Sequence, residues 1–245
     1  FSACGSTSDE AWLAIEQDNA PDGSVFLAEE QSSARGRMGR SWHAPAGVGL
    51  YLSLVLRMKI PPERVSYVTS CAALAVASTI EQFVHLPAEI KWPNDILIGG
   101  RKVAGILVES RSNFPDTYVV GIGLNVNHRS EDFPKAIAET ATSLRHERGG
   151  KHVHRIRLIR PLLFYLDSVF AQLRKKKFER IAAAWKEFVN IEGKRVLLRA
   201  KGEDISGTLE SIDLEKGVTV LLDAGLTRTY RPEHVASIRE AEESA

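Results

Sequence analysis

The segment from Gln31 to Trp42, called the arginine loop below, has the clearest chemical potential in this sequence. It places Arg35, Arg37 and Arg40 within six residues and separates them with glycines. Glycine lets a backbone turn tightly and bring its N–H groups close to a ligand, while guanidinium groups make paired hydrogen bonds to carboxylates or phosphates. No side chain in the loop is an obvious nucleophile or base. We therefore expect it to bind an anion and to stabilise developing charge.

A predicted hairpin carries a second group of polar side chains. The adjacent glycines 99 and 100 lie between two apolar runs, a pattern typical of a two-residue turn. The predicted register pairs Ile98 with Arg101, Leu97 with Lys102, and Asp95 with Ala104. Asp95 and Lys102 then share one face of the sheet, about 7 to 8 Å apart at the backbone, within reach of a lysine side chain. A longer turn would shift this register by one residue.

A third polar position follows another strand, predicted over residues 118–127. Its glycines at 121 and 123 would let another group approach the backbone, and Asn125 follows them. A dinucleotide-binding fingerprint is not indicated, because a third glycine and a following helix are missing.

Ordinary structural roles compete with each of these interpretations. The arginine loop could be a solvated turn, Lys102 an exposed hairpin lysine, and Asn94-Asp95 a simple turn. Trp92 is more typical of a core, whereas Trp42 beside a basic loop is harder to explain that way. The seven histidines show no metal or triad spacing, so we expect no metal site built from protein ligands.

The polar groups must be positioned by a mixed set of helices and strands. Strands are predicted over 25–28, 49–57 and 118–127, and segment 49–57 is apolar on both faces, with Ser53 among its leucines. Ser6 to Glu10 carries a helix-capping pattern. Further helices are predicted from Pro61 with a core face that includes Phe83, around 133–139, from Ile156 with Pro161 in or near the first turn, and over 178–188.

The last part of the sequence changes to short strands separated by glycine-containing turns, over 195–200, 205–212, 218–223 and 227–230. This texture predicts a small β-barrel. We place the boundary near Asn190, which gives a first domain over residues 1–190 and a second over 191–245.

Composition excludes several broad classes of protein. The 245 residues are 44% hydrophobic and carry a formal net charge of +1, which favours a globular fold without a field that would attract nucleic acid or an anionic membrane. We expect no apolar run of transmembrane length and no signal peptide. Cys4 and Cys71 fit no metal spacing, and a reducing cytoplasm is the simpler expectation, although one disulfide stays open.

Together, the cationic loop, the lysine and the missing nucleophile suggest acyl activation. A carboxylate and a triphosphate repel each other, so arginines and a lysine that neutralise both can align them for attack at phosphorus without a covalent enzyme intermediate.

The same residues resemble the biotin protein ligases, in a form without an N-terminal DNA-binding domain. The similarity extends over nearly the whole chain. The matching motifs are Ser6-Thr7, the arginine loop, Leu50-Tyr-Leu-Ser, Lys91-Trp-Pro-Asn-Asp95, Arg101-Lys-Val-Ala-Gly-Ile-Leu-Val-Glu109 and Gly121-Ile-Gly-Leu-Asn125. The resemblance implies an α+β catalytic domain with a mixed or antiparallel sheet flanked by helices, followed by an SH3-like β-barrel.

The resemblance also implies a function in two steps. Biotin and ATP, with Mg²⁺, would form biotinyl-5'-AMP and pyrophosphate, and a lysine of a biotin carboxyl carrier domain would then accept biotin. The implied partners include no nucleic acid and no membrane, and the protein would be a cytoplasmic monomer or homodimer.

By resemblance, each candidate site residue has a role. The biotin-binding residues would be Ser6, Thr7, Gln31, Arg35, Arg37 and Lys102. The nucleotide-binding residues would be Arg40, Trp42, Asn94 and Asn125. Catalysis would depend on Lys102, Arg37 and Asp95, with Lys102 bridging the biotin carboxylate and the α-phosphate.

The sequence departs from the family pattern at Ser33, Ala34 and Ser8. Alanine, glycine and asparagine respectively are more usual there, so we expect altered tuning of the biotin pocket. We also expect residues 33–40 to be mobile without ligand and ordered with the adenylate, because clustered arginines repel one another until an anion binds.

Two alternative functions remain open at this point. A lipoate or octanoate ligase or transferase of the same fold is the nearest, although it should carry a different loop in place of Arg35 to Arg40. The second alternative is a non-catalytic binding protein, either a biotin sensor or an RNA-binding module. The near-zero net charge argues against RNA binding.

Overall fold

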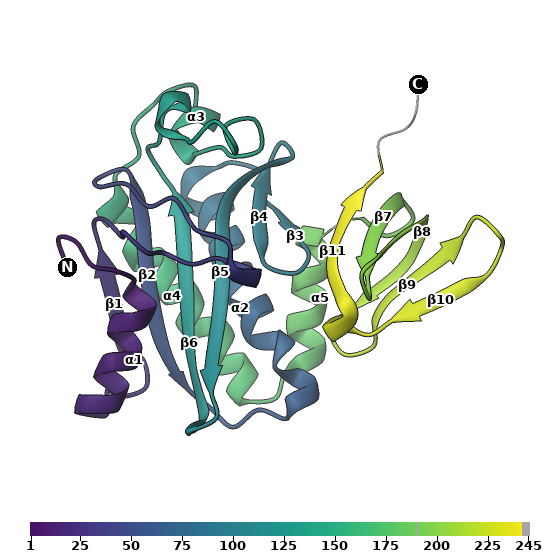
Figure 1. The fold of residues 1–245 in the computed structure, drawn as a ribbon, viewed down its shortest axis with the longest axis horizontal. Coiled ribbons are helices and arrows are strands. Elements are labelled where there is room, and N and C mark those ends of the chain that lie inside the picture. Colours follow the sequence, from purple (N-terminus) through teal and green to yellow (C-terminus); the bar gives the residue numbers. More distant parts are fainter. Residues whose placement is uncertain (190, 242–245) are drawn as a thin grey trace.

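The computed structural model describes residues 1–189 and 191–241. Its centre is a six-stranded sheet in the order β1-β2-β6-β5-β4-β3 (Figure 1). The strands are β1 (Val25–Ala28), β2 (Gly49–Arg57), β3 (Glu89–Lys91), β4 (Asp95–Ile98), β5 (Arg101–Arg111) and β6 (Phe114–Asn125). Every neighbouring pair is antiparallel. The antiparallel form of the predicted sheet is therefore confirmed.

Helices cover both faces of this sheet. One face packs against α2 and α4, and α1 lies on the other face beside β1 and β2 (Figure 1). The helices are α1 (Thr7–Asp18), α2 (Ser66–Thr79), α3 (Leu144–Glu147), α4 (Arg155–Arg174) and α5 (Phe178–Val189). Short single turns occur at Arg37–Gly39, Pro62–Arg64, Ile80–Val84, Ser130–Asp132 and Pro232–His234.

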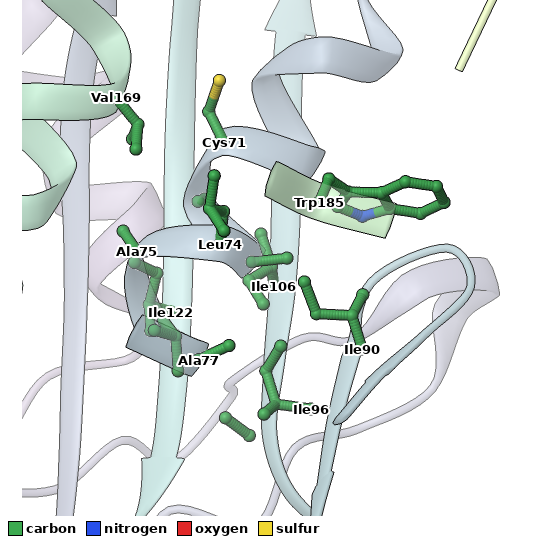
Figure 2. Packing of buried hydrophobic residues seen from close by; sticks show 14 of the residues in the cluster. Cys71, Leu74, Ala75, Ala77, Ile90, Ile96, Ile106, Ile122, Val169 and Trp185 are labelled. Atoms are coloured by element: carbon green, nitrogen blue, oxygen red, sulfur yellow. The ribbon is translucent and has the colours of Figure 1, made fainter. Parts of the chain in front are cut away.

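Strand β2 is buried along both faces, as its continuous apolar run predicts. Its even-numbered leucines, from Leu50 to Leu56, belong to the main core beneath α2 and α4. Val55 points to the opposite face and packs in a smaller cluster with Trp12 of α1. Figure 2 shows part of the main core, where Leu74 of α2 lies beside Ile106 of β5. The site described below occupies the part of the α1 face that α1 leaves uncovered.

The segment Pro62–Val84 corrects the expectation that the sequence contains no apolar run of transmembrane length. Its 23 residues contain an 18-residue window with a mean hydropathy of 1.2, so by length and composition the segment meets the requirement for a membrane span. However, 72% of its most apolar window is buried inside the protein. It is the central core helix of the larger sheet.

Two details of the predicted helices are wrong, the core position of Phe83 and the helix around residues 133–139, and the structure defines the start of α4 more closely. Phe83 is 54% exposed, because α2 ends in a π-type turn over Ile80–Val84, and the extra residue in such a turn rotates later side chains away from the core face. Ile156 is 83% exposed in the first turn of α4, ahead of the buried stripe that starts at Leu158. Pro161 lies in the second turn of α4, inside the helix. Residues 135–140 form successive turns instead of a helix.

The C-terminal part forms a second antiparallel sheet in the order β10-β9-β8-β7-β11 (Figure 1). The strands are β7 (Arg195–Ala200), β8 (Glu203–Asp213), β9 (Gly217–Leu222), β10 (Thr227–Tyr230) and β11 (Val235–Glu240). Four of the five were predicted, and β11 was missed. The sheet is consistent with a small SH3-like barrel. Asn190 lies outside the described residues, and the division into residues 1–190 and 191–245 stays a prediction.

The second sheet contacts the N-terminal end of α2. Ser66 Oγ donates to the backbone oxygen of Leu214 at 2.9 Å, and the Tyr67 hydroxyl donates to Glu215 at 3.2 Å. Arg64 forms an ion pair with the same Glu215 carboxylate at 3.2 Å. One acidic residue of the β8–β9 turn therefore joins the second sheet to the start of α2.

Candidate functional site

Glycines of the two central strands give the site a bare backbone floor. Gly105 of β5 pairs with Gly123 of β6, and Gly121 of β6 pairs with Leu107. A β-carbon added at Gly123 would lie 2.5 Å from Trp42 Cε2, and one added at Gly105 would lie 3.0 Å from Trp42 Cζ3. The indole of Trp42 therefore lies directly on this floor. Its Nε1–H is buried and has no acceptor among the residues that the structure describes.

The arginine loop crosses in front of β2, β6 and β5 and covers a cavity above the strand glycines (Figure 1). Gly36 N donates to the Arg40 oxygen at 2.7 Å and Trp42 N to the Ala34 oxygen at 2.9 Å, which makes the loop a small hairpin. Met38 at its tip has φ +57°, a left-handed conformation. The predicted mobility of residues 33–40 without ligand stays a prediction.

Hydroxyl and amide groups line one end of the enclosed cavity. Ser6 caps α1 and accepts from Ser8 N, as the capping pattern predicts. Ser53 of β2 is fully buried, and its Oγ lies 2.8 Å from Thr7 Oγ1 and 3.0 Å from Ser8 Oγ. Gln31 Oε1 accepts from both the backbone N and the hydroxyl of Thr7, at 2.7 and 3.0 Å. This end suits a small ligand with several hydrogen-bonding groups.

The hairpin places Lys102 beside Asp95, although not by the predicted register. Ile98 faces Arg101 and Leu97 faces Lys102, as predicted, but a β-bulge follows and Asp95 faces Gly105 instead of Ala104. The ion pair between Lys102 Nζ and Asp95 Oδ1 measures 2.6 Å. A β-carbon at Gly105 would lie 3.2 Å from Lys102 Cε, so the lysine stem crosses the bare glycine to reach Asp95. The missing side chain at 105 makes room for this contact.

Arg37 points into the cavity beside Lys102. Its Nη1 lies 3.5 Å from Asn94 Oδ1, and Asn94 Nδ2 donates to the Ile106 oxygen at 2.7 Å. Although Arg37 as a whole residue is exposed, desolvation of its guanidinium lowers its pKa, and nearby Arg40 adds to this effect. A desolvated cation of this kind would gain from an anionic ligand.

Arg35 uses its guanidinium within the protein. It donates to both carboxylate oxygens of Asp9 at 2.7 Å and to Glu109 Oε1 at 3.3 Å. The spacing of Asp9 from Ser6 suggests that its carboxylate caps the start of α1, but here the carboxylate binds Arg35 instead. The hydrogen bond with Arg35 holds the pKa of Asp9 below its usual range.

A second cavity, of about 390 Å³, adjoins the first, which is about 60 Å³. Both are lined by Trp42, Arg37, Lys102, Asn94 and Gly36. The second cavity adds Arg40, Phe133, Ile137 and Asn125, whose Nδ2 donates to the Thr142 oxygen at 3.0 Å. Its aromatic and aliphatic walls with one buried amide suit a flat heterocycle. Arg37 and Lys102 therefore lie where a ligand in the first cavity would meet a ligand in the second.

A histidine pair beside this cavity was not predicted to matter. His43 Nε2 lies 2.8 Å from the Asp132 oxygen, which joins the end of the arginine loop to the segment after β6. His128 is fully buried, stacks on Phe133 at 5.0 Å and lies 3.4 Å from the Tyr51 hydroxyl. Burial lowers the pKa of His128 to about 4, with a smaller effect in the same direction from His43.

Ala34 occupies its position without the strain that a missing glycine would suggest. Its φ is not among the positive values of the described residues, and its side chain is buried against Ala44 and Tyr51. Alanine therefore fits the closed loop and packs its base.

All the candidate site residues from the sequence line one of the two cavities. Asp9 and Glu109, the partners of Arg35, were not predicted. Ser53 and Gly105 were also missed; the signals were a hydroxyl within a leucine run and a glycine within a strand. Ser8, expected to alter the tuning of the biotin pocket, lines the first cavity. The described residues contain no cluster of three or more His, Cys, Asp or Glu side chains that would hold a metal. Asp95 is the acidic group that lines the shared region, and one carboxylate plus ligand phosphates is a usual Mg²⁺ set.

Comparison with protein families identifies a relationship for the first half of the chain. Residues 3–127 match the sequence model of the "Biotin/lipoate A/B protein ligase family". This range contains the arginine loop, the hairpin and Asn125.

Individual relatives extend the match further. A bifunctional ligase/repressor BirA of Bacillus spizizenii is 34% identical over 218 residues, covering 88% of this chain and 67% of the relative. A biotin–[acetyl-CoA-carboxylase] ligase of Mycobacterium tuberculosis is 34% identical over 216 residues, covering 83% and 78%. The solved structure of a biotin protein ligase from Aquifex aeolicus in complex with biotin and ATP has a TM-score of 0.83 at 27% identity and covers 98% of this chain and 97% of its own.

Proposed function

Because the chain belongs to the biotin/lipoate A/B protein ligase family, we propose that its two joined cavities bind biotin and ATP for the synthesis of biotinyl-5'-AMP. The enzyme is a biotin protein ligase. The name of one relative supports acetyl-CoA carboxylase as the acceptor, and on this proposal the acceptor group is a lysine of its biotin carboxyl carrier domain. The observation that carries this function is the position of Arg37 and Lys102 in the walls of both cavities.

In the first step, the biotin carboxylate attacks the α-phosphorus of ATP and pyrophosphate leaves. Biotin lies with its ring at the hydroxyl end, among Ser6, Thr7 and Gln31, and with its carboxylate toward Lys102. The ammonium of Lys102 neutralises the carboxylate and the α-phosphate as they approach, which lowers the repulsion between two anions. Arg37 stabilises the charge that builds on the phosphoryl oxygens.

The nucleotide occupies the second cavity. Its adenine lies near Trp42 and Asn125, with Asn94 and Arg40 toward the phosphates. Asp95 has two tasks on this proposal: it holds Lys102 in place before ATP arrives, and its carboxylate would be the protein ligand of Mg²⁺. When bound, Mg²⁺ neutralises charge on the leaving pyrophosphate.

In the second step, the ε-amine of the carrier lysine attacks the carbonyl carbon of the mixed anhydride. The C–N bond forms, the C–O bond to AMP breaks, and AMP leaves with the electron pair of that bond. The amine loses one proton, and on this proposal the carboxylate of Asp95, which lies 2.6 Å from Lys102 Nζ, accepts it. The closed arginine loop keeps water from the anhydride before the carrier arrives.

The partners and location follow as further parts of this proposal. We expect the protein to act in the cytoplasm as a monomer or homodimer, with a carrier domain and without nucleic acid or membrane. Its net charge of +1 and its free Cys4 and Cys71 support these expectations. Light scattering at several protein concentrations would determine the oligomeric state, and a filter-binding assay with duplex DNA would detect unexpected affinity.

One assay distinguishes this function from lipoate activation and from simple binding. The protein is incubated with ATP, Mg²⁺ and a carrier domain, with either biotin or lipoate as the acid. Pyrophosphate release and a mass gain on the carrier are expected with biotin only. If the protein is active with lipoate and inactive with biotin, it is a lipoate ligase. If no pyrophosphate is released with biotin or with lipoate, an enzymatic role is contradicted.

A further inference from the structure

Arg35 of the arginine loop makes its side-chain hydrogen bonds to carboxylates of the protein itself. Asp9 in the first turn of α1 accepts from Nη1 and Nη2 of Arg35 at 2.7 Å each, and Glu109 of β5 accepts from Nη2 at 3.3 Å. A two-point fork between guanidinium and carboxylate is among the stronger ion-pair geometries. One side chain thereby joins the loop to a helix and to a strand that are far apart in the sequence.

This cluster leaves Arg35 with little capacity for a ligand anion. Two carboxylates face one guanidinium, so an approaching carboxylate or phosphate would meet an excess of negative charge. The hydrogen bond to Asp9 and the charge of Glu109 also raise the pKa of Arg35 above its usual value. Arg111, the other cation acting on Asp9, forms its own ion pair with Glu16. Arg35 is therefore satisfied before any substrate binds.

The outer half of the loop has few other side-chain links to the rest of the protein. Its base is tied by the backbone bond from Ser33 N to the Gly5 oxygen at 2.8 Å. Beyond Ala34, within residues 35–40 of the described chain, the side-chain hydrogen bonds to other elements come from Arg35 and, at 3.5 Å, from Arg37 to Asn94. Lifting the loop would therefore break the Arg35 cluster first.

We propose that Asp9 and Glu109 are positioning residues that hold the arginine loop closed through Arg35. Arg35 then acts as a latch between the loop and the scaffold and not as a contact to biotin. The inference rests on the proposed function for its consequence: a latched loop retains the adenylate and shields its anhydride from water until the carrier arrives.

The test compares Asp9→Asn, Glu109→Gln and the double variant with Glu10→Gln. Glu10 is the matched control, because it lies beside Asp9 in the same turn of α1, changes the charge equally and has no ion pair among the described residues. Two rates are measured with biotin, ATP and Mg²⁺ but no carrier: single-turnover formation of biotinyl-AMP, and its escape into solution. Trypsin cleavage after the loop arginines is followed without substrates.

In the double variant, escape should rise about fivefold while formation changes less than about twofold, as expected for the loss of a partly exposed ion-pair cluster. Added KCl should speed escape from the wild-type protein and have little effect on the double variant, since screening acts on the latch charges. Arg35→Lys keeps the positive charge but loses the two-point hydrogen bonding of the guanidinium. Its rate of adenylate escape should therefore lie between the rates of the wild-type protein and the double variant. Trypsin should cut the loop faster in the double variant than in Glu10→Gln.

Unchanged escape and unchanged trypsin cleavage in the double variant would overturn the latch, and so would an equal rise for Glu10→Gln. Failure of the proposed function looks different. In that case the wild-type protein forms no adenylate, yet the trypsin comparison still reports whether Asp9 and Glu109 hold the loop.

Discussion

Trp42 rests directly on Gly123, so closely that a β-carbon on the glycine would come within 2.5 Å of the indole. The contact joins the end of the arginine loop to the middle of the central sheet. Because Trp42 lines both cavities, its height above the floor sets the space for both ligands.

Adding one methyl group at this contact should therefore weaken nucleotide binding. We expect Gly123→Ala to raise the KM for ATP about tenfold, since the indole must move by a large fraction of a van der Waals radius, and such overpacking costs on the order of 1 to 3 kcal/mol. Steady-state kinetics with each substrate varied would measure it. Gly5→Ala, which adds a methyl group into open space, should leave the KM unchanged. An unchanged KM for ATP in Gly123→Ala would show that Trp42 does not shape the nucleotide site.

Removal of the Lys102 ammonium should abolish most adenylation. We expect Lys102→Ala to slow single-turnover pyrophosphate release by about 100- to 1000-fold, the usual loss for one group that stabilises transition-state charge. Far-UV circular dichroism should show an unchanged fold. The exposed Lys151→Ala serves as the control. Wild-type adenylation rates in Lys102→Ala would remove its assigned role.

The buried Ser53 hydroxyl should support both stability and biotin binding. Ser53→Ala leaves the hydroxyls of Thr7 and Ser8 without their shared partner, so the free energy of unfolding should fall by about 1 to 2 kcal/mol and the KM for biotin should rise several-fold. Urea denaturation and biotin titration measure the two effects. Ser70→Ala is the control, a buried serine whose hydroxyl makes no hydrogen bond within the described residues. Equal behaviour of the two variants would argue against the network.

His128 should make folding stability depend on pH. Its native pKa of about 4 lies below the usual 6.5, so below pH 6.5 the unfolded chain binds a proton that the native protein excludes. Stability should therefore be highest above pH 6.5 and fall by about 3 kcal/mol as the pH drops to 4. Urea denaturation across this range should show a flatter profile for His128→Gln than for the exposed control His234→Gln. Identical profiles for both variants would contradict a buried neutral imidazole.

The fold and the Asp95–Lys102 contact could be predicted because each depends on a strong local pattern. Two adjacent glycines between apolar runs determined the hairpin turn, and side-chain alternation then placed both residues on one face. The β-bulge between Ile96 and Leu97, which leaves the fully buried Val103 without a partner on β4, could not be predicted from the turn pattern. The contact survives since the bulge moves Asp95 opposite a glycine that the lysine can cross.

Long-range pairings explain the rest of the differences. The chemistry of Arg35 predicted an anionic partner, but a local sequence pattern does not reveal that Asp9 and Glu109 converge on it from two other elements. Ser53 looked like an ordinary residue of a buried strand, and its importance depends on α1 lying above it. Phe83 fell on the wrong face because one π-type turn changed the helical period.

The glycine floor also limits how the substrate range of this enzyme can be altered. Gly105, Gly121 and Gly123 carry no side chains to trim, so no substitution at these positions can deepen the cavity. Space for a larger analogue of the acid would have to come from the arginine loop, where residues 33–40 include side chains that can be shortened. Selection for a bulkier substrate should therefore yield changes in the arginine loop and leave Gly105, Gly121 and Gly123 unchanged.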